Sequence, residues 1–334
     1  MGIDSLKKIL VLATGGTIAS TPRQGGLAPG LPIDQFAGYF EHSKTVSVDF
    51  KVLMNKDSTN MQPEDWVTMA RTIQENLVFY DSFIITHGTD TMAYTSAALS
   101  YLLLGIPKTV VITGSQVPVS FKKTDARKNI RDALTFAQKS DIPGVFIIFD
   151  GKAILGTRAI KMRTKSYDAF ESVNYPYIAA IDGQNIRVTC RPKPEQVTFK
   201  THLGICPEVF LLKAFPGLSP DFFDYLSEHI KGLIIESFGN GGLPFLSRNL
   251  VNGVAGLVRK GIPVIITTQC LEEGQNINLY EVGKRVADAG GITAGDMNTE
   301  TIVAKLMWVL SQTADPKTIR QMIQTSLAHD LDYI

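Results

Sequence analysis

Short, nearly continuous runs of apolar residues recur along the chain, and β-branched residues are frequent in them. Strands that are buried on both faces of a parallel sheet have this composition, because neither face carries polar side chains. The runs cover residues 8–14, 82–86, 109–113, 144–149, 232–237 and 263–268. Segments with helical periodicity lie between them, as over 63–77, where Trp66 and Ile73 fall on one face. The alternation predicts an α/β fold built on a doubly wound, mostly parallel sheet.

The alternation weakens in the middle of the chain. A Gly-Lys turn there suggests a hairpin over residues 152–163, and a polar, proline-bearing stretch precedes a renewed α/β pattern from Val209 onward. We therefore expect two domains, of which the larger is N-terminal and the smaller is also of the α/β type. The expected boundaries are an N-terminal domain over 1–190, a linker over 191–207 and a C-terminal domain over 208–334.

Composition and charge exclude several classes of protein. The 334 residues carry 33 Lys and Arg against 32 Asp and Glu, so a formal charge of +1 provides no long-range field that would attract nucleic acid. No apolar run approaches the roughly 18 residues of a membrane span, and the N-terminal apolar stretch is too short for a signal peptide. We expect a cytoplasmic protein that binds neither nucleic acid nor membranes.

The residues that could bind a metal are sparse and scattered. The cysteines, Cys190, Cys206 and Cys270, are an odd number at no metal-like spacing, and the five histidines form no cluster. This usage favours reduced thiols over disulfides, and Cys270 is expected to be a small buried apolar residue. The sequence therefore predicts neither a metal nor an organic cofactor.

Threonine and glycine follow several of the predicted strands. The loop over 14–17 reads TGGT, and the loop over 87–91 reads HGTDT. Ligands of open parallel sheets bind at the edge where the strands end, because loops and helix N-termini converge there. Each loop alone also fits a tight turn or a helix cap, and neither has the spacing of a dinucleotide or phosphate loop. The two loops together predict a hydroxyl-lined pocket.

A threonine hydroxyl is a weak nucleophile until a base removes its proton. The chain has no Ser-His-Asp order and no G-x-S-x-G elbow, so we expect the base to be an amine that burial keeps neutral. Lys161, in the segment GTRAIKMRTKSYDAF, is a candidate. The spacing of residues does not distinguish Lys161 from the other lysines of the chain, because most lysines are solvated charges at the protein surface.

The segments TGGTIAS at 14–20 and THGTDTMAYTSAALS at 86–100 resemble the two signature segments of the bacterial-type L-asparaginases. The segments DSTNMQPEDW, TGSQVP, GTRAIKMRT and TTQC are similar in the same order, so the resemblance covers essentially the whole chain. HGTDTMAYT is highly specific, whereas TGGTI alone is less so. The DST-x-M-x-PEDW run, the TQC segment and the lack of a signal peptide most resemble the type I, cytoplasmic branch.

The resemblance implies a catalytic set. Thr14 matches the family's first-loop nucleophile. Thr89, Asp90 and Lys161 match a second set, in which lysine activates a threonine hydroxyl while aspartate orients the lysine and meets the substrate's α-ammonium. The implied reaction is hydrolysis of the side-chain amide of L-asparagine through an acyl-enzyme, with backbone N–H groups stabilising the oxyanion.

The resemblance also implies substrate-binding residues. Ser58 falls on the residue that holds the α-carboxylate, Asp57 and Thr59 flank it, and Ser115 sits where backbone groups of the family meet the scissile amide. The pocket separates asparagine from glutamine by one methylene, which a tight site discriminates by only about 10–200-fold. Activity on glutamine is therefore compatible with the expected site.

Members of the family are homodimers or homotetramers, in which the neighbour's smaller domain completes each active site, and the same assembly is expected here. Many members carry a tyrosine after the first loop, where this sequence has Leu27. No hydroxyl from that position can assist the reaction, so another group must supply any role of that tyrosine.

Two other functions fit parts of the pattern. Relatives with an extra N-terminal domain are components of amidotransferases that release ammonia from glutamine for use on tRNA. The first predicted strand begins by Lys8, so that domain is expected to be absent. A non-catalytic α/β module that binds an amino acid or nucleotide through its glycine turns is the third possibility. Tight binding of a nucleotide in calorimetry, with no turnover, would identify it.

Some type I members bind a second, activating asparagine with an arginine before a Ser-aromatic-Gly turn and a cysteine after a Thr-Gln pair. Here Glu236 stands at the place of the arginine and Cys270 at that of the cysteine. Because a carboxylate repels the α-carboxylate of asparagine, we expect hyperbolic kinetics. Initial rates measured across asparagine concentration test this, and a Hill coefficient well above one would contradict it.

Overall fold

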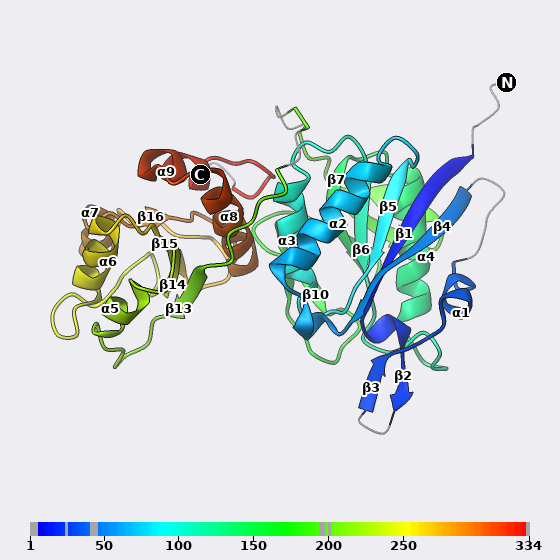
Figure 1. The fold of residues 1–334 in the computed structure, drawn as a ribbon, viewed down its shortest axis with the longest axis horizontal. Helices are drawn as coiled ribbons and strands as arrows, with labels where there is room; N and C mark the ends of the chain where they lie inside the picture. The colour runs from blue at the N-terminus through cyan, green and yellow to red at the C-terminus, as the bar shows by residue number, and fades with distance from the viewer. Residues whose placement is uncertain (1–5, 24–25, 41–45, 194–197, 200–201, 332–334) are drawn as a thin grey trace. The chain divides into compact units, whose positions relative to one another are not determined.

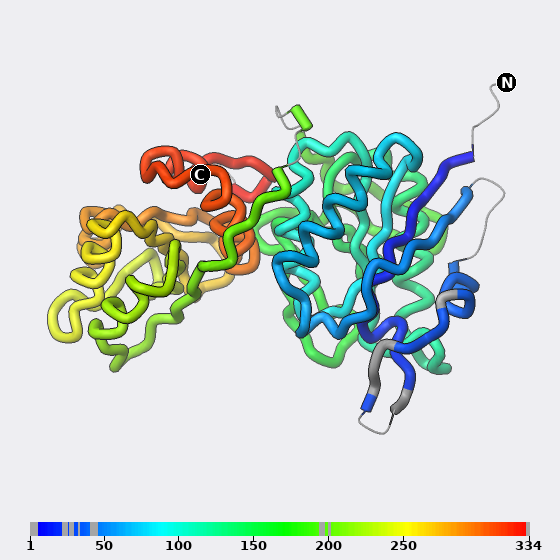
Figure 2. Tube along the Cα trace, in the orientation of Figure 1, coloured from blue at the N-terminus to red at the C-terminus, as the bar shows by residue number. Residues whose placement is uncertain are grey.

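The computed structural model describes residues 6–23, 26–40, 46–193, 198–199 and 202–331 of the chain. The chain divides into two compact units, Met1–Leu203 and Gly204–Ile334, which are described separately. Figure 2 follows the trace through the first unit, from blue to green, and through the second, from green to red.

The first unit is built on an eight-stranded sheet. In spatial order its strands are β12 (Asn185–Val188), β11 (Ala179–Asp182), β8 (Lys152–Leu155), β7 (Gly144–Phe149), β6 (Thr109–Thr113), β5 (Ser82–Thr86), β1 (Lys7–Gly15) and β4 (Val46–Lys56). Pairing from β4 through β1, β5 and β6 to β7 is parallel, and β8, β11 and β12 continue the sheet with antiparallel pairing. The predicted mostly parallel sheet is confirmed.

Helices cover both faces of this sheet (Figure 1). The helices of the unit are α1 (Ile33–Ala37), α2 (Pro63–Asn76), α3 (Met92–Leu102) and α4 (Ala126–Lys139), with short 3-10 turns η1 (Thr17–Ala19) and η2 (Ser58–Asn60). Successive strand residues point to opposite faces, so Val11, Ile84 and Val111 share a core with Ile130 and Phe136 of α4. Burial on both faces explains why the central strands read as unbroken apolar runs.

Two small hairpins extend the unit beyond its main sheet. They pair β2 (Ser20–Arg23) with β3 (Gly26–Pro29), and β9 (Ala159–Lys161) with β10 (Phe170–Ser172). The hairpin predicted over 152–163 is wrong in its pairing. Residues from β8 pair with β7 around the turn at Gly151, whereas β9 leaves that sheet and pairs with β10. The turn signal marked the reversal of the chain but not the partner of each strand.

The second unit is a smaller α/β layer structure. Its parallel sheet has the order β13 (Val209–Lys213), β14 (Gly232–Ser237), β15 (Val264–Thr268) and β16 (Ile292–Thr293). The helices are α5 (Phe222–Leu226), α6 (Leu250–Arg259), α7 (Glu281–Asp288), α8 (Thr299–Gln312) and α9 (Pro316–Ile323). A larger N-terminal sheet domain and a smaller C-terminal α/β domain agree with the expected fold class.

A buried hydrogen-bond chain joins α2 and α3 to the end of β5. The indole N–H of Trp66 donates to Thr95 Oγ1 at 2.9 Å, and Thr95 lies 3.0 Å from His87 Nε2. His87 Nδ1 lies 2.6 Å from the carbonyl oxygen of Gly88. Because a carbonyl only accepts, Nδ1 carries a proton. Full burial favours the neutral ring, in which Nε2 accepts from the Thr95 hydroxyl.

This neutral state has a consequence for stability. Burial lowers the pKa of His87 from 6.5 to about 4, and the hydrogen bond to Gly88 opposes that change only in part. In the unfolded chain the ring binds a proton near pH 6.5, whereas in the folded protein it does so only near pH 4. The contribution of the neutral ring to the free energy of unfolding is therefore complete above pH 6.5 and is lost as the pH falls towards 4.

We predict that His87 accounts for about 3 kcal/mol of acid destabilisation between pH 6.5 and pH 4. Urea unfolding of the wild type and of His87→Gln across this range checks it, because the variant lacks the titrating ring. The difference in free energy of unfolding between the wild type and His87→Gln should become smaller as the pH falls. His229→Gln changes an exposed histidine and serves as the control; a constant difference for His87→Gln would contradict the prediction.

Candidate active site

The loops singled out in the sequence leave neighbouring strands at one edge of the large sheet. β4, β1, β5 and β6 are adjacent and parallel, so their carboxyl ends lie side by side. The TGGT loop follows β1, the HGTDT loop follows β5, and the segments that begin at Asp57 and Gly114 follow β4 and β6. This is the edge at which open parallel sheets bind ligands.

Glycine backbones let three of these loops touch. Gly16 has φ of 79°, and a Cβ built on it would lie 2.4 Å from the backbone nitrogen of Gly88. A Cβ on Gly88 would lie 2.5 Å from Ser58 Oγ. Neither position has room for a side chain, and Gly16 also needs the positive φ that other residues rarely adopt. The TGGT and HGTDT loops are therefore packed backbone against backbone, and Ser58 packs its side chain directly against the backbone of Gly88.

Thr89, Asp90 and Lys161 form one polar cluster. Lys161 Nζ donates to Thr89 Oγ1 at 2.8 Å and to Asp90 Oδ1 at 2.6 Å. The lysine side chain is 16% exposed and the aspartate side chain 55% exposed, whereas Thr89 is buried. The ion pair therefore lies nearer to solvent than the threonine hydroxyl that it contacts. The amine of Lys161 is thus paired with a carboxylate.

Thr14 lies on the adjacent strand at the same edge. It is buried near the end of β1, and its hydroxyl donates to the backbone carbonyl of Thr86, the last residue of β5, at 2.7 Å. Its hydroxyl is thus held by β5 rather than by the Lys161 cluster. The HGTDT loop starts directly after Thr86, so both threonine-bearing loops leave from paired strands.

The turn at residues 57–59 is hydrogen-bonded to the HGTDT loop. Ser58 Oγ accepts from the backbone N–H of Asp90 at 3.2 Å, and Ser58 carbonyl accepts from Thr91 Oγ1 at 2.7 Å. Asp57 Oδ1 accepts from the backbone N–H and the hydroxyl of Thr59, at 2.9 and 2.8 Å. Asp57 and Thr59 therefore shape the turn, and the buried Ser58 lies against Asp90.

The segment after β6 is held by the carboxylate of Asp125, which the sequence did not indicate. Asp125 accepts from the backbone N–H groups of Gln116 and Val117, at 2.8 and 3.0 Å, and from Asn129. Burial raises the pKa of Asp125, although the hydrogen bonds from backbone N–H groups oppose the rise. Ser115 is fully buried and donates to the carbonyl of Val117 at 2.7 Å, so it fixes the same loop.

Gln116 also escaped the sequence analysis. Its side chain lies between the HGTDT loop and the loop of the β9–β10 hairpin, where it contacts Thr89 and the carbonyls of Arg163 and Ser166. The signal available was its place in the TGSQVP segment, directly after Ser115, but a glutamine there gives no indication of its partners.

Charged residues stiffen the hairpin that carries Lys161. Arg163 donates to Glu171 at 2.7 Å and to the carbonyl of Asp168 at 2.7 Å, and Tyr177 also donates to Glu171. Partial burial would raise the pKa of Glu171, but the hydrogen bonds from Tyr177 and Arg163 outweigh it and hold the pKa below its usual value. β9 has three residues, so this ion pairing supports the strand on which Lys161 is placed.

Other predicted features fall outside the site. Cys270 is exposed, so its expected burial is wrong. Leu27 lies on β3, and its side chain is outside the part that the structure describes. Within the described ranges, no three His, Cys, Asp or Glu side chains are grouped to hold a metal ion. No helix among the described residues has the length and apolar character needed to cross a membrane.

Comparison with known proteins gives the same family along the whole chain. A family model for the N-terminal domain of asparaginase matches residues 8–194, and one for the glutaminase/asparaginase C-terminal domain matches residues 208–323. An L-asparaginase of Thermococcus kodakarensis is 40% identical over 97% of this chain and 99% of that protein. The solved structure of the thermostable L-asparaginase from that organism has a TM-score of 0.93, with 39% identity over 98% of this chain and all of that one.

Two further relatives are similar over nearly all of this chain. L-asparaginase 1 of Escherichia coli is 34% identical over 97% of this chain and 98% of that protein. A glutamyl-tRNA(Gln) amidotransferase component of Methanobrevibacter smithii is 33% identical over 98% of this chain and 78% of that protein. The resemblance found in the sequence is thereby confirmed, and the chain belongs to the asparaginase family of enzymes.

Proposed function

We propose that this protein hydrolyses L-asparagine to L-aspartate and ammonia, that a threonine nucleophile carries the reaction, and that it acts in the cytoplasm. The observation that carries the proposal is the contact of Lys161 with both Thr89 and Asp90, next to the buried Thr14 on the neighbouring strand. An amine, two threonine hydroxyls and a carboxylate at one sheet edge are the groups that amide hydrolysis needs.

The proposed substrate site uses both charges of the amino acid. Lys161 contacts Oδ1 of Asp90, so the second carboxylate oxygen can meet the α-ammonium. Ser58 Oγ accepts from the N–H of Asp90, which leaves its own proton to donate to the α-carboxylate. These two groups lie on touching loops, so one amino-acid head group reaches both. The side-chain amide then points towards Thr14 and Ser115.

In the proposed acylation step, Thr14 Oγ1 attacks the side-chain carbonyl carbon. Its hydroxyl proton passes to the Thr89–Lys161 pair, and backbone N–H groups of the loops stabilise the oxyanion. The tetrahedral intermediate then collapses. The C–N bond breaks, the leaving nitrogen takes the proton from the relay, and ammonia departs while an ester to Thr14 remains.

Deacylation repeats the sequence with water. Water gives a proton to the same relay and attacks the ester carbonyl, and Thr14 recovers its proton as L-aspartate leaves. The β-methyl group of threonine restricts χ1, so the hydroxyl is aimed with a smaller loss of entropy than serine would incur. The hydrogen bond to Thr86 holds that rotamer in the unliganded site.

We predict that Thr14→Ala lowers the rate of ammonia release from L-asparagine by at least about 10³-fold, because it removes the nucleophile. Lys161→Met should lower it by about 10²–10⁴-fold, because the relay loses its proton acceptor. Thr68→Ala removes an exposed hydroxyl on α2 and is the matched control, with activity within about twofold of the wild type.

The same assay separates this proposal from its alternatives. A component of a tRNA-dependent amidotransferase would prefer glutamine and retain tRNA at low salt, whereas a binding module would bind an amino acid or nucleotide without turnover. The relative from Methanobrevibacter smithii makes the first alternative the more specific one. Absence of ammonia release from L-asparagine by the purified protein alone would overturn the proposal.

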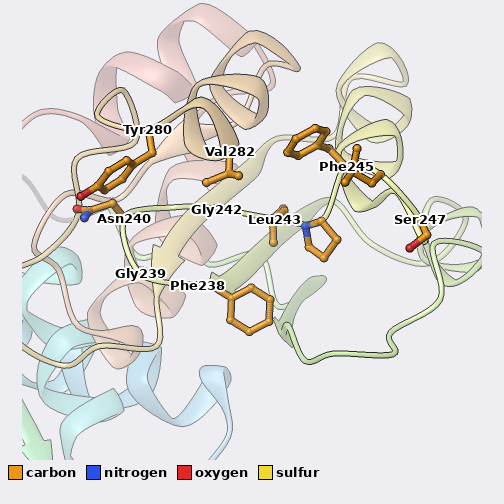
Figure 3. A pocket seen from close by; sticks show the side chains of 11 residues that line it. Phe238, Gly239, Asn240, Gly242, Leu243, Phe245, Ser247, Tyr280 and Val282 are labelled. Carbon is orange, nitrogen blue, oxygen red and sulfur yellow. The ribbon is translucent and has the colours of Figure 1, made fainter.

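We also propose that the protein works as a homodimer or homotetramer. Support comes from the second unit, where apolar side chains line an open cavity of about 590 Å³ beyond the end of β14 (Figure 3). Tyr280 is 59% exposed, Val282 is 40% exposed and Leu246, on the same lining, is 84% exposed. Contiguous exposed apolar groups of this kind favour association with another copy.

The expected result is sedimentation of the wild type as two or four chains. Leu246→Asp combined with Tyr280→Asp should shift the equilibrium towards single chains, because both charges would be buried by association. Val78→Asp, an equally exposed site on the first unit, is the control. An active wild-type monomer in equilibrium sedimentation would contradict the proposal.

A further inference from the structure

Gln116 contacts Thr89, the hydroxyl partner of Lys161, and the loop of the hairpin that carries the lysine. Thr89 Oγ1 lies 3.2 Å from Gln116 Oε1. The amide nitrogen of Gln116 donates to the carbonyls of Arg163 and Ser166, at 3.3 and 3.2 Å. Its backbone N–H is held by Asp125 at 2.8 Å, so the residue is fixed at both ends.

These contacts determine which way the amide faces. The backbone carbonyls of Arg163 and Ser166 accept hydrogen bonds and donate none, so they need the NH₂ group. A flipped amide would place its oxygen against two other oxygens and leave both carbonyls without this donor. The oxygen of Gln116 therefore faces Thr89, and it can only accept.

The direction of the Thr89 proton follows. Because Gln116 Oε1 accepts, the hydroxyl of Thr89 must donate to it. The lone pairs of Thr89 then accept from Lys161 at 2.8 Å, and Lys161 also donates to Asp90. In this arrangement Lys161 gives two hydrogen bonds and takes none. The arrangement is thus one in which the lysine cannot yet receive the proton of Thr89.

We propose that Gln116 is a positioning residue of the asparagine-hydrolysing site, which holds the hydroxyl proton of Thr89 away from Lys161 until the relay is used. The inference rests on the proposed function. For the relay to operate, Lys161 first loses a proton to solvent and its lone pair then faces Thr89. The hydroxyl turns from Gln116 to Lys161, and its O–H bond breaks as the N–H bond of the ammonium forms. Thr89 recovers a proton from Thr14.

Several charged groups lie in the same region as Lys161, and Lys152 and Asp168 pair with Glu171 and Arg163 there. Asp90, from the HGTDT loop, is its ion-pair partner. Arg163 and Glu171, on the hairpin, pair with each other at 2.7 Å. Asp125, at the start of α4, is occupied by backbone N–H groups of the Gln116 loop. Changes at Gln116 therefore act on Lys161 through the direction of the Thr89 hydroxyl and through any charge placed at position 116.

Two substitutions at this position are expected to act in opposite directions. Gln116→Met keeps the length of the side chain, but its sulfur is only a weak hydrogen-bond acceptor. Thr89 can then donate to the neutral lysine, and the base form persists to lower pH. Gln116→Glu keeps the acceptor and adds negative charge, which favours the ammonium. The acid limb of the pH profile of kcat should move down in the first variant and up in the second, each by about half a pH unit or more.

The experiment measures kcat and KM for L-asparagine in the wild type and both variants between about pH 5 and about pH 10. Thermal unfolding shows that each variant is folded, and Gln321→Met, an exposed glutamine on α9, controls for the exchange itself. A merely structural role would alter the unfolding temperature and leave both acid limbs where they are.

Acid limbs that stay in place, or that move in the same direction, would overturn the inference. A large rise in KM with unmoved limbs would assign Gln116 to substrate binding and would overturn it too. A wild type without activity on asparagine would instead overturn the proposed function, so the two failures are distinguishable.

Discussion

Close backbone contact at Gly16 and Gly88 is the constraint on which the candidate site depends. A parallel sheet brings the ends of β1 and β5 side by side, but side chains would normally keep the loops beyond them apart. With glycine at both positions, the backbones of the TGGT and HGTDT loops touch, and the side chain of Ser58 packs directly against Gly88. The hydroxyls and the carboxylate of three separate segments can then serve one small molecule.

Proton chemistry at this edge depends on hydrogen-bond direction as much as on distance. Thr89 has one proton and two neighbours that compete for it, the oxygen of Gln116 and the nitrogen of Lys161. The lysine is held by the Asp90 carboxylate instead of being isolated in an apolar environment.

The sequence predicted the central strands well, because burial on both faces leaves a run such as 109–113 little freedom in composition. It did not predict that β8 pairs with β7 and β9 with β10. A turn signal shows where the chain reverses but not which strand the next segment will pair with. Lys161 was identified through family resemblance, as no spacing links a lysine to a threonine 72 positions away. Gln116 was missed because a glutamine acquires its role from the tertiary contacts alone.

The glycine contacts also limit how the specificity of this pocket could be altered. A side chain at Gly16 or Gly88 would push the touching loops apart, so this floor of the proposed pocket is fixed. Variation in substrate length must then come from the walls, at the turn over residues 57–59 and in the segment around Ser115. A search for variants that favour glutamine is best confined to those two walls.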